Sequence, residues 1–266
     1  MRAAEIFERW YVATVLEPAV GRGRAIRRMA ELAEIRDRLL REATIAPTAD
    51  VLDLGCAYGL VTWPAGEEAG HAFGADPDPA LIAAGMTVPA TGATLLAADP
   101  DRLPLPAASF DVVLWRGTLA RRPAQAREIL GEAFRVLRPE GRLCFAEPAP
   151  LEARPEDPAM RDLWARLRAA PGGLFHRDGL ETIVESAGFT GAHAKIERRR
   201  TTVEDERAAR EVFEGAAPGS VALGRLLAHA GMPETILRVY VETVASRAPV
   251  TLEVPEVYVT AEKPRR

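Results

Sequence analysis

The chain has 266 residues, of which 48% are hydrophobic and 27% are charged, and its formal net charge is −4. This balance is typical of a globular protein with a sizeable core, and it excludes the overall basic field that attracts nucleic acid. The two cysteines, Cys56 and Cys144, cannot build a disulfide framework or a cysteine-rich zinc site. No run approaches the roughly 18 apolar residues of a membrane span, and the first residues lack the apolar core of a signal peptide. We expect a cytoplasmic protein without a metal.

The first part of the chain has the pattern of an amphipathic helix. From residue 2 to about residue 43, apolar side chains such as Met29, Ala33 and Leu40 recur near helical spacing, with Arg and Glu between them. We expect a helical N-terminal extension over residues 1–47.

The next hundred residues alternate strand-like and helix-like segments. Apolar runs predict strands at residues 51–54, 71–75, 93–98, 110–115 and 142–146. A helix is expected over residues 123–137, followed by a turn at Pro139-Glu140-Gly141. Strands that alternate with helices at this spacing indicate βαβ units and a parallel sheet. We assign this sheet to a core of residues 48–148.

Beyond Glu147 the alternation is less regular. Four prolines between residues 148 and 158 predict a loop across the mouth of the sheet. The later patterns predict helices at 161–169 and 177–187, a strand at 192–197, a helical cover at 202–246 and a final strand at 253–261. No repeat or linker divides the chain. We therefore expect one domain, in which residues 149–250 form the loop and cover and residues 251–266 the final strand and tail.

The turn after the first predicted strand, in the stretch VLDLGCAYG, is the candidate site. In an open parallel sheet, ligands bind beyond the carboxyl ends of the strands, where the strand order reverses. Gly55 and Gly59 let the backbone approach a ligand closely. Asp76 lies 23 positions after Asp53, the spacing at which an acidic side chain binds a ribose diol. The turn therefore predicts a nucleoside-binding site.

The residues of this turn discriminate between nucleotide cofactors. A dinucleotide fingerprint needs glycine at positions 55, 57 and 60, where this chain has Gly55, Ala57 and Leu60. A phosphate-binding G-x-x-x-x-G-K-[ST] loop is missing from the sequence as well. Asp53 repels phosphates but suits the ammonium group of an amino-acid-bearing nucleoside. The chemistry thus favours S-adenosylmethionine over NAD.

Several segments in order carry a family resemblance. VLDLGCAYG, FGADPDPALI, LLAADPDRLPLPAASFDVVLWRGTL and ILGEAFRVLRPEGRLCFAEP span about residues 48–148, and GLETIVESAGF and VPEVYVTAEKP follow. Together they resemble class I S-adenosylmethionine-dependent methyltransferases of the small-molecule, methyltransferase type 11-like group. The resemblance implies an α/β, Rossmann-like sheet of seven mostly parallel strands with the last strand antiparallel. A helical N-terminal extension and a helical cover complete the expected fold.

The same resemblance assigns S-adenosylmethionine as the cofactor and implies its contacts. The residues implied around the methionine moiety are Asp53, Gly55, Cys56, Ala57, Gly59, Trp115 and Arg116. Those implied at the ribose and the adenine are Asp76, Pro77, Asp99 and Pro100. Tyr11, from the N-terminal extension, would close over the cofactor.

Some of these residues have a plain structural interpretation beside the functional one. Asp99 could form an ordinary Asp-Pro turn, and Tyr11 could pack within its helices. Cys56 fits the turn as a small residue. His176 follows a glycine pair, where it could act as a base toward the acceptor or simply begin a helix. The sequence leaves these alternatives open.

One proline predicts where the helix after the turn begins. Pro64 lies too far beyond Gly59 for a helix that starts at that glycine. We predict that the helix starts near Trp63 with Pro64 as its first residue, where proline is tolerated. The loop between Gly55 and Trp63 would then be longer and looser than in related proteins, which bears on cofactor affinity.

The predicted function is transfer of a methyl group from S-adenosylmethionine to a small-molecule acceptor, with S-adenosylhomocysteine as the product. Acceptor contacts are expected from residues 148–176 and 202–246, and neither nucleic acid nor a membrane is an expected partner. The acceptor and the oligomeric state are left open. A cofactor-binding relative that does not methylate, such as a cyclase-like enzyme or a regulatory module, is the alternative.

Overall fold

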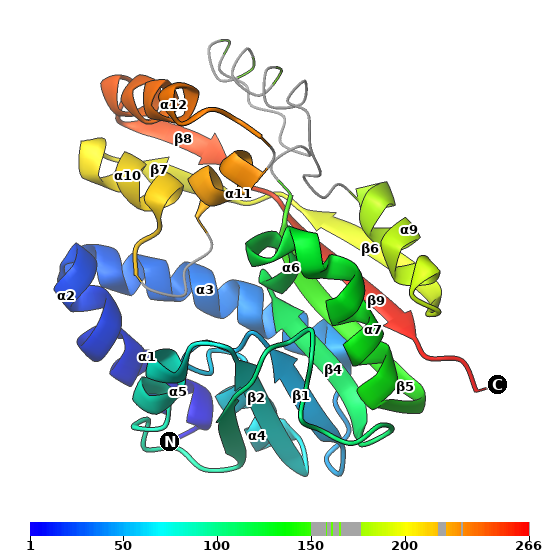
Figure 1. The fold of residues 1–266 in the computed structure, drawn as a ribbon. Helices are drawn as coiled ribbons and strands as arrows, with labels where there is room; N and C mark the ends of the chain where they lie inside the picture. Colours follow the sequence, from blue (N-terminus) through cyan, green and yellow to red (C-terminus); the bar gives the residue numbers. More distant parts are fainter. Residues whose placement is uncertain are drawn as a thin grey trace.

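A seven-stranded sheet forms the centre of the computed structural model, which describes residues 1–149, 158, 161, 165, 177–217, 222–229 and 231–265 (Figure 1). The strand order is β3-β2-β1-β4-β5-β9-β6. The strands are β1 (Asp50–Leu54), β2 (His71–Asp76), β3 (Ala93–Ala97), β4 (Phe110–Arg116), β5 (Leu137–Pro148), β6 (Thr190–Glu197) and β9 (Glu256–Glu262). The pairings among β1 to β5 are parallel, and β9 runs antiparallel to both of its neighbours, β5 and β6. The predicted fold class is confirmed, with β9 as the antiparallel last strand.

The strand order reverses between β1 and β4. From β1 the chain continues outward through β2 and β3, and it then returns to form β4 and β5 on the other side of β1. Ligands bind at such a reversal because the loops that leave the two central strands diverge there. The turn after β1 and the end of β4 therefore border the same crevice.

Two layers of helices cover the sheet. On one face, α3 (Arg22–Ala43) and α4 (Thr62–Glu68) pack on alternate residues such as Val51 and Leu114. On the other face, α6 (Thr118–Arg121), α7 (Ala126–Val136) and α9 (Arg177–Ser186) pack on the intervening residues, Leu52 and Trp115 among them. Successive side chains of a strand point to opposite faces. This alternation decides which residues of a strand reach each layer.

The N-terminal extension is helical, as predicted, but it is interrupted. It comprises α1 (Ala3–Tyr11), a π-helical turn η1 (Val12–Leu16), α2 (Glu17–Val20) and α3. Gly21, which has a φ of +81°, separates α2 from α3. A positive φ is easily adopted by glycine, so the chain can turn here and lay α1 beside α4.

The helical cover contains a small sheet that the sequence patterns do not predict. Helices occupy most of the predicted range 202–246, but β7 (Arg200–Val203) at its start pairs with β8 (Val250–Glu253) beyond its end. This pair packs with α10 (Glu206–Glu214), α11 (Leu223–His229) and α12 (Glu234–Ser246) around Phe213, Leu227 and Val244. Of the predicted final strand at 253–261, residues 256–261 form β9, which joins the main sheet, whereas Glu253 is the last residue of β8.

The structure differs from the turn that was predicted after the helix at 123–137. The turn expected at Pro139-Glu140-Gly141 lies inside β5, where the pairing with β4 jumps from Phe110–Leu137 to Val112–Arg142. Those residues form an irregularity within the strand, with Glu140 at a φ of +64°. The predicted loop that begins at residue 148 and the helix at 161–169 fall almost entirely outside the described residues.

The late start of the helix after the turn is confirmed. Residues 57–61 form turns, and α4 begins at Thr62, so Pro64 is its third residue rather than its first. The position differs from the prediction, but the physical reason holds, because the N–H groups of the first helical turn have no intrahelical partner. Proline is therefore tolerated at this position.

α5 (Pro79–Gly85) follows β2, and the short η2 (Pro123–Gln125) precedes α7. Within the described ranges, no helix has both the length and the apolar character needed to cross a membrane.

Candidate active site

The turn after β1 is held against the end of β2. Gly55 N and Cys56 N both donate to the carbonyl oxygen of Ala75, at 2.6 and 3.1 Å. Three residues of the turn have positive φ: Gly55 at +69°, Ala57 at +49° and Gly59 at +91°. Ala57 therefore adopts a left-handed conformation although it has a Cβ atom, which costs about 1 kcal/mol. The glycine-rich character of the turn is thus a backbone requirement, and Ala57 meets it with strain.

Asp53 is buried below this turn. Its side chain is 2% exposed, and its Oδ2 accepts a hydrogen bond from Thr62 Oγ1 at 2.7 Å. Burial raises the pKa of Asp53 to about 7, against the lowering effects of the Thr62 hydrogen bond and of the nearby Arg121 charge. A cation brought to Asp53 would favour its ionised form.

Asp76 joins the turn to the end of β2. Its Oδ2 accepts from Ala57 N at 2.9 Å, and its Oδ1 accepts from Asp78 N at 3.0 Å. The side chain is 4% exposed. Because each carboxylate oxygen has two lone pairs, Asp76 keeps acceptor capacity for a ligand. Pro77 follows directly, and Asp78 accepts from Ala80 N as the N-cap of α5.

Two side chains of α6 close over Gly55. Thr118 Oγ1 donates to the carbonyl oxygen of Leu54 at 2.6 Å, and Arg121 Nη2 donates to that of Gly55 at 2.6 Å. A Cβ atom on Gly55 would lie 2.7 Å from Arg121 Nη2. Burial lowers the pKa of Arg121, whereas the charges of Asp76 and Glu147 raise it. Glycine at position 55 is therefore required for this close approach.

Trp115 and Arg116, adjacent in sequence, point to opposite faces of β4. Trp115 is fully buried, stacks on Phe145 with ring centroids 4.5 Å apart, and donates from Nε1 to Glu147 Oε1 at 2.9 Å. Glu147 also accepts from Leu119 N and Ala120 N. The side chain of Trp115 thus faces the core under α6 and not the pocket predicted for it. Arg116 instead points toward α3, because side chains alternate along a strand.

Burial raises the pKa of Glu147 to about 7, although its three N–H donors lower it. Sequence reasoning missed this residue, which anchors α6 and with it Arg121.

The first hollow lies between the turn after β1 and the N-terminal extension. Six of the predicted site residues line it: Tyr11, Asp53, Gly55, Cys56, Ala57 and Arg116. The other lining residues are Phe7, Arg28, Leu32, Tyr58, Leu60, Val61 and Arg121. Tyr11 stacks on Phe7 and lies against Tyr58, with ring centroids 5.3 and 5.5 Å away. Tyr11 thus belongs both to the helix packing and to the hollow.

Cys56 contributes bulk rather than reactivity to this hollow. It is a free thiol, 5% exposed. Burial, followed by the charges of Asp53 and Asp76, raises its pKa well above the usual value, which disfavours the nucleophilic thiolate.

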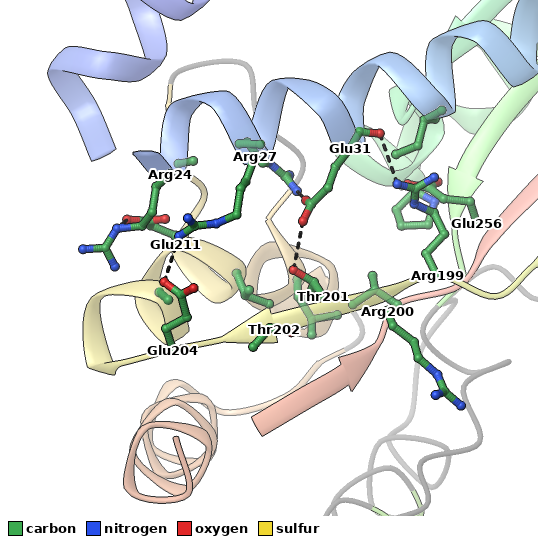
Figure 2. A pocket seen from close by; sticks show the side chains of 18 of the residues that line it. Arg24, Arg27, Glu31, Arg199, Arg200, Thr201, Thr202, Glu204, Glu211 and Glu256 are labelled. Carbon is green, nitrogen blue, oxygen red and sulfur yellow. Dashed lines mark hydrogen bonds and ion pairs between the residues drawn. The ribbon is translucent and has the colours of Figure 1, made fainter. Parts of the chain in front are cut away.

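A second, larger hollow lies between α3 and the cover (Figure 2). Its unoccupied volume is about 1120 Å³, open solvent included. Charged side chains bridge its walls: Arg24 pairs with Asp205 and Arg27 with Glu204, both at 2.8 Å. Arg28 and Arg116 line both hollows. The two hollows therefore adjoin each other at these two arginines.

The wall of the second hollow has an apolar part and a charged part. The apolar lining consists of Ile35, Pro148, Ala208, Val212, Ala216, Leu223, Leu226 and Val254. The charged lining consists of Arg24, Arg27, Arg28, Arg116, Arg199, Arg200, Glu31, Glu204, Glu211 and Glu256. The cover residues among them, 208–226, lie within the predicted range 202–246, whereas the contribution of α3 was not predicted.

Of the other predicted residues that the structure describes, none lines either hollow. Asp99 is half exposed and pairs with Arg122 at 3.1 Å, and Pro100 beside it is buried. Gly59 lies against the ring of Trp63. His176 lies outside the described residues. Across the described ranges, no group of three or more His, Cys, Asp or Glu side chains is placed to hold a metal ion.

The turn with left-handed residues after β1 and the carboxylate at the end of β2 lie at the point where the strand order of this Rossmann-like sheet reverses. Residues 52–145 match the family model of a Methyltransferase domain. No curated protein sequence matches the chain.

Solved structures share the fold. The YcgJ protein from Bacillus subtilis is 13% identical, with a TM-score of 0.59 over 87% of this chain and 98% of its own. A SAM-dependent methyltransferase from Methanosarcina mazei is 14% identical, with a TM-score of 0.52 over 86% of this chain and 98% of its own. The [4+2]-cyclase SpnF is 17% identical, with a TM-score of 0.53 over 87% of this chain and 80% of its own.

The resemblance seen in the sequence is therefore confirmed. Residues 52–145 match a methyltransferase domain, and the chain has the fold of S-adenosylmethionine-dependent methyltransferases, the class of protein for which S-adenosylmethionine is the cofactor.

Proposed function

We propose that this chain transfers the methyl group of S-adenosylmethionine to a small-molecule acceptor. On this proposal the first hollow binds the methionine end of the cofactor, and the second hollow binds the acceptor. The observation that carries the proposal is the junction of the two hollows at Arg28 and Arg116. A methyl donor in the first hollow would present its sulfonium toward this junction and so toward the acceptor.

The charges of the first hollow fit an amino-acid-bearing cofactor. Asp53 lies on the inner wall as a partner for the ammonium group, and Arg121, Arg28 and Arg116 are candidates for the carboxylate. Asp76 retains lone pairs for the ribose hydroxyls beyond the turn. We propose that Asp99 and Pro100 border the adenine, with Asp99 exchanging its Arg122 contact for the adenine amino group.

The cofactor supplies an already activated methyl group, so the protein contributes mainly position and the exclusion of water. Tyr11, Phe7 and Tyr58 would shield the methionine end from α1 and from the turn. α3 and the cover form the walls around the acceptor, and the chain would then work as a single domain.

Isothermal titration with S-adenosylmethionine, S-adenosylhomocysteine and NAD tests this function. Binding of the first two without NAD, followed by methylation of a compound from an acceptor panel, is the expected outcome. If neither sulfur nucleoside binds, the proposal is wrong.

A related function without methyl transfer is the second candidate. The cyclase SpnF shares this fold, and in this chain Ala57 strains the turn while Arg121 occupies the carbonyl oxygen of Gly55. Binding of S-adenosylmethionine with no methyl loss across the panel would favour this candidate.

A further inference from the structure

An ion pair at the junction of the two hollows has one unused polar atom on each partner. Arg116 Nη2 donates to Glu256 Oε1 at 3.0 Å, and the two side chains are 13% and 4% exposed. Among the described residues, neither Arg116 Nε nor Glu256 Oε2 has a hydrogen-bond partner. Buried polar atoms without partners are rare because each one costs free energy. A ligand that supplies both partners would remove this cost.

The topology explains why Glu256 lies at the junction. β9 runs antiparallel to β5, with Glu256 opposite Pro148. The first residue of β9 is therefore at the same edge of the sheet as the last residue of β4, which is Arg116. Both side chains also line the second hollow. A carboxylate and a guanidinium from distant parts of the sequence thus meet where the acceptor would be held.

We propose that Glu256 binds the hydroxyl group of the methyl acceptor and takes its proton, while Arg116 Nε binds a neighbouring oxygen of the same molecule. This inference rests on the proposed function. The acceptor class is a neutral molecule with an apolar skeleton and an acidic hydroxyl, phenolic or enolic, beside a carbonyl oxygen. The apolar lining, which includes Ile35 and Val212, matches such a skeleton.

The guanidinium beside Glu256 favours a hydroxyl over an amine. Arg116, which pairs with Glu256 at 3.0 Å, places a positive charge next to the reacting group and repels a protonated amine. The same charge stabilises a developing phenolate or enolate. In the transfer, the hydroxyl oxygen forms its bond to the methyl carbon, the carbon–sulfur bond breaks with its electron pair left on sulfur, and the hydroxyl proton passes to Glu256 Oε2.

The test compares matched probes on the protein loaded with S-adenosylhomocysteine. Binding of 2′-hydroxyacetophenone and of its methyl ether is measured by ligand-observed NMR for the native chain, Glu256→Gln and Glu253→Gln. The Glu256→Gln change keeps the size of the side chain but removes its negative charge. The control residue Glu253 also pairs with an arginine, Arg198, but does not line the hollow.

The native chain and Glu253→Gln should bind the hydroxyl probe about tenfold more tightly than its ether. In Glu256→Gln this preference should fall below about twofold, while the affinity for S-adenosylhomocysteine stays within about twofold of native. An unchanged preference in Glu256→Gln overturns the proposal, as does a native chain that binds S-adenosylhomocysteine but shows no preference for the hydroxyl probe. Failure to bind S-adenosylhomocysteine at all would instead disprove the proposed function.

Discussion

Arg121 Nη2 donates a hydrogen bond to the carbonyl oxygen of Gly55 at 2.6 Å. This contact ties α6, which follows the fourth strand, to the turn that follows the first strand. It also places a buried cation beside Asp53 and Asp76, whose charges interact with it. The guanidinium of Arg121 thus links the two sides of the crevice at the point where the strand order reverses.

Replacing Arg121 should weaken cofactor binding. In Arg121→Met the hollow loses a partner for the cofactor carboxylate, and we expect the dissociation constant for S-adenosylmethionine to rise about tenfold or more in calorimetry. As a control, Arg127→Met, on the exposed face of α7, should leave this dissociation constant within about twofold of the native value. Tighter binding in Arg121→Met would mean that the guanidinium competes with the cofactor for the Gly55 carbonyl.

Relieving the strain at Ala57 should stabilise the protein. Ala57→Gly removes the Cβ atom from a residue with a φ of +49°, and we expect urea unfolding to show a gain of about 0.5–1 kcal/mol. The matched change Ala84→Gly, inside α5, should cost about 1 kcal/mol. A loss of stability in both variants would contradict the strain at position 57.

Cofactor affinity should depend on the ionisation of Asp53. Burial raises the pKa of Asp53 to about 7, so much of this carboxyl is neutral below pH 7 and must lose its proton to pair with an ammonium group. We expect the affinity to rise by up to about tenfold from pH 6 to pH 7.5, with proton release measurable by calorimetry in different buffers. Asp53→Asn should bind weakly without this rise. If the native chain and Asp53→Asn released equal numbers of protons on binding the cofactor, Asp53 would be excluded as the source of these protons.

Glu147 should make stability fall as the pH increases. Burial raises its pKa from 4.5 to about 7, so between these values the folded chain binds more protons than the unfolded chain. The unfolding free energy of the native chain should therefore decrease relative to Glu147→Gln by up to about 3 kcal/mol from pH 4.5 to pH 7. Glu140→Gln, at an exposed ion pair with Arg265, should show no such trend. If the unfolding free energy of the native chain instead increased with pH relative to that of Glu147→Gln, the raised pKa of Glu147 would be wrong.

Local patterns in the sequence were sufficient to locate the strands of the main sheet, the turn after β1 and the class of the fold. Apolar runs and their spacing are local properties, so β1 through β4 were located within one or two residues. Asp53, Gly55 and Ala57, which line the first hollow, could be predicted as site residues because they are contiguous with a strand that periodicity identifies. The late start of α4 followed from Pro64, whose missing N–H restricts its place in a helix.

The set of side chains that meet around the site depends instead on how distant segments pack. Trp115 and Arg116 are neighbours in sequence, yet β4 directs the first into the core and the second into the hollows. Arg28 and Arg121 lie in helices far apart in the chain, and Glu256 reaches the junction because β9 runs antiparallel to β5. Periodicity fixes the face that a residue takes within its own strand or helix. Which faces pack together depends on the strand order and the crossings of the chain, and these arise from contacts between distant segments.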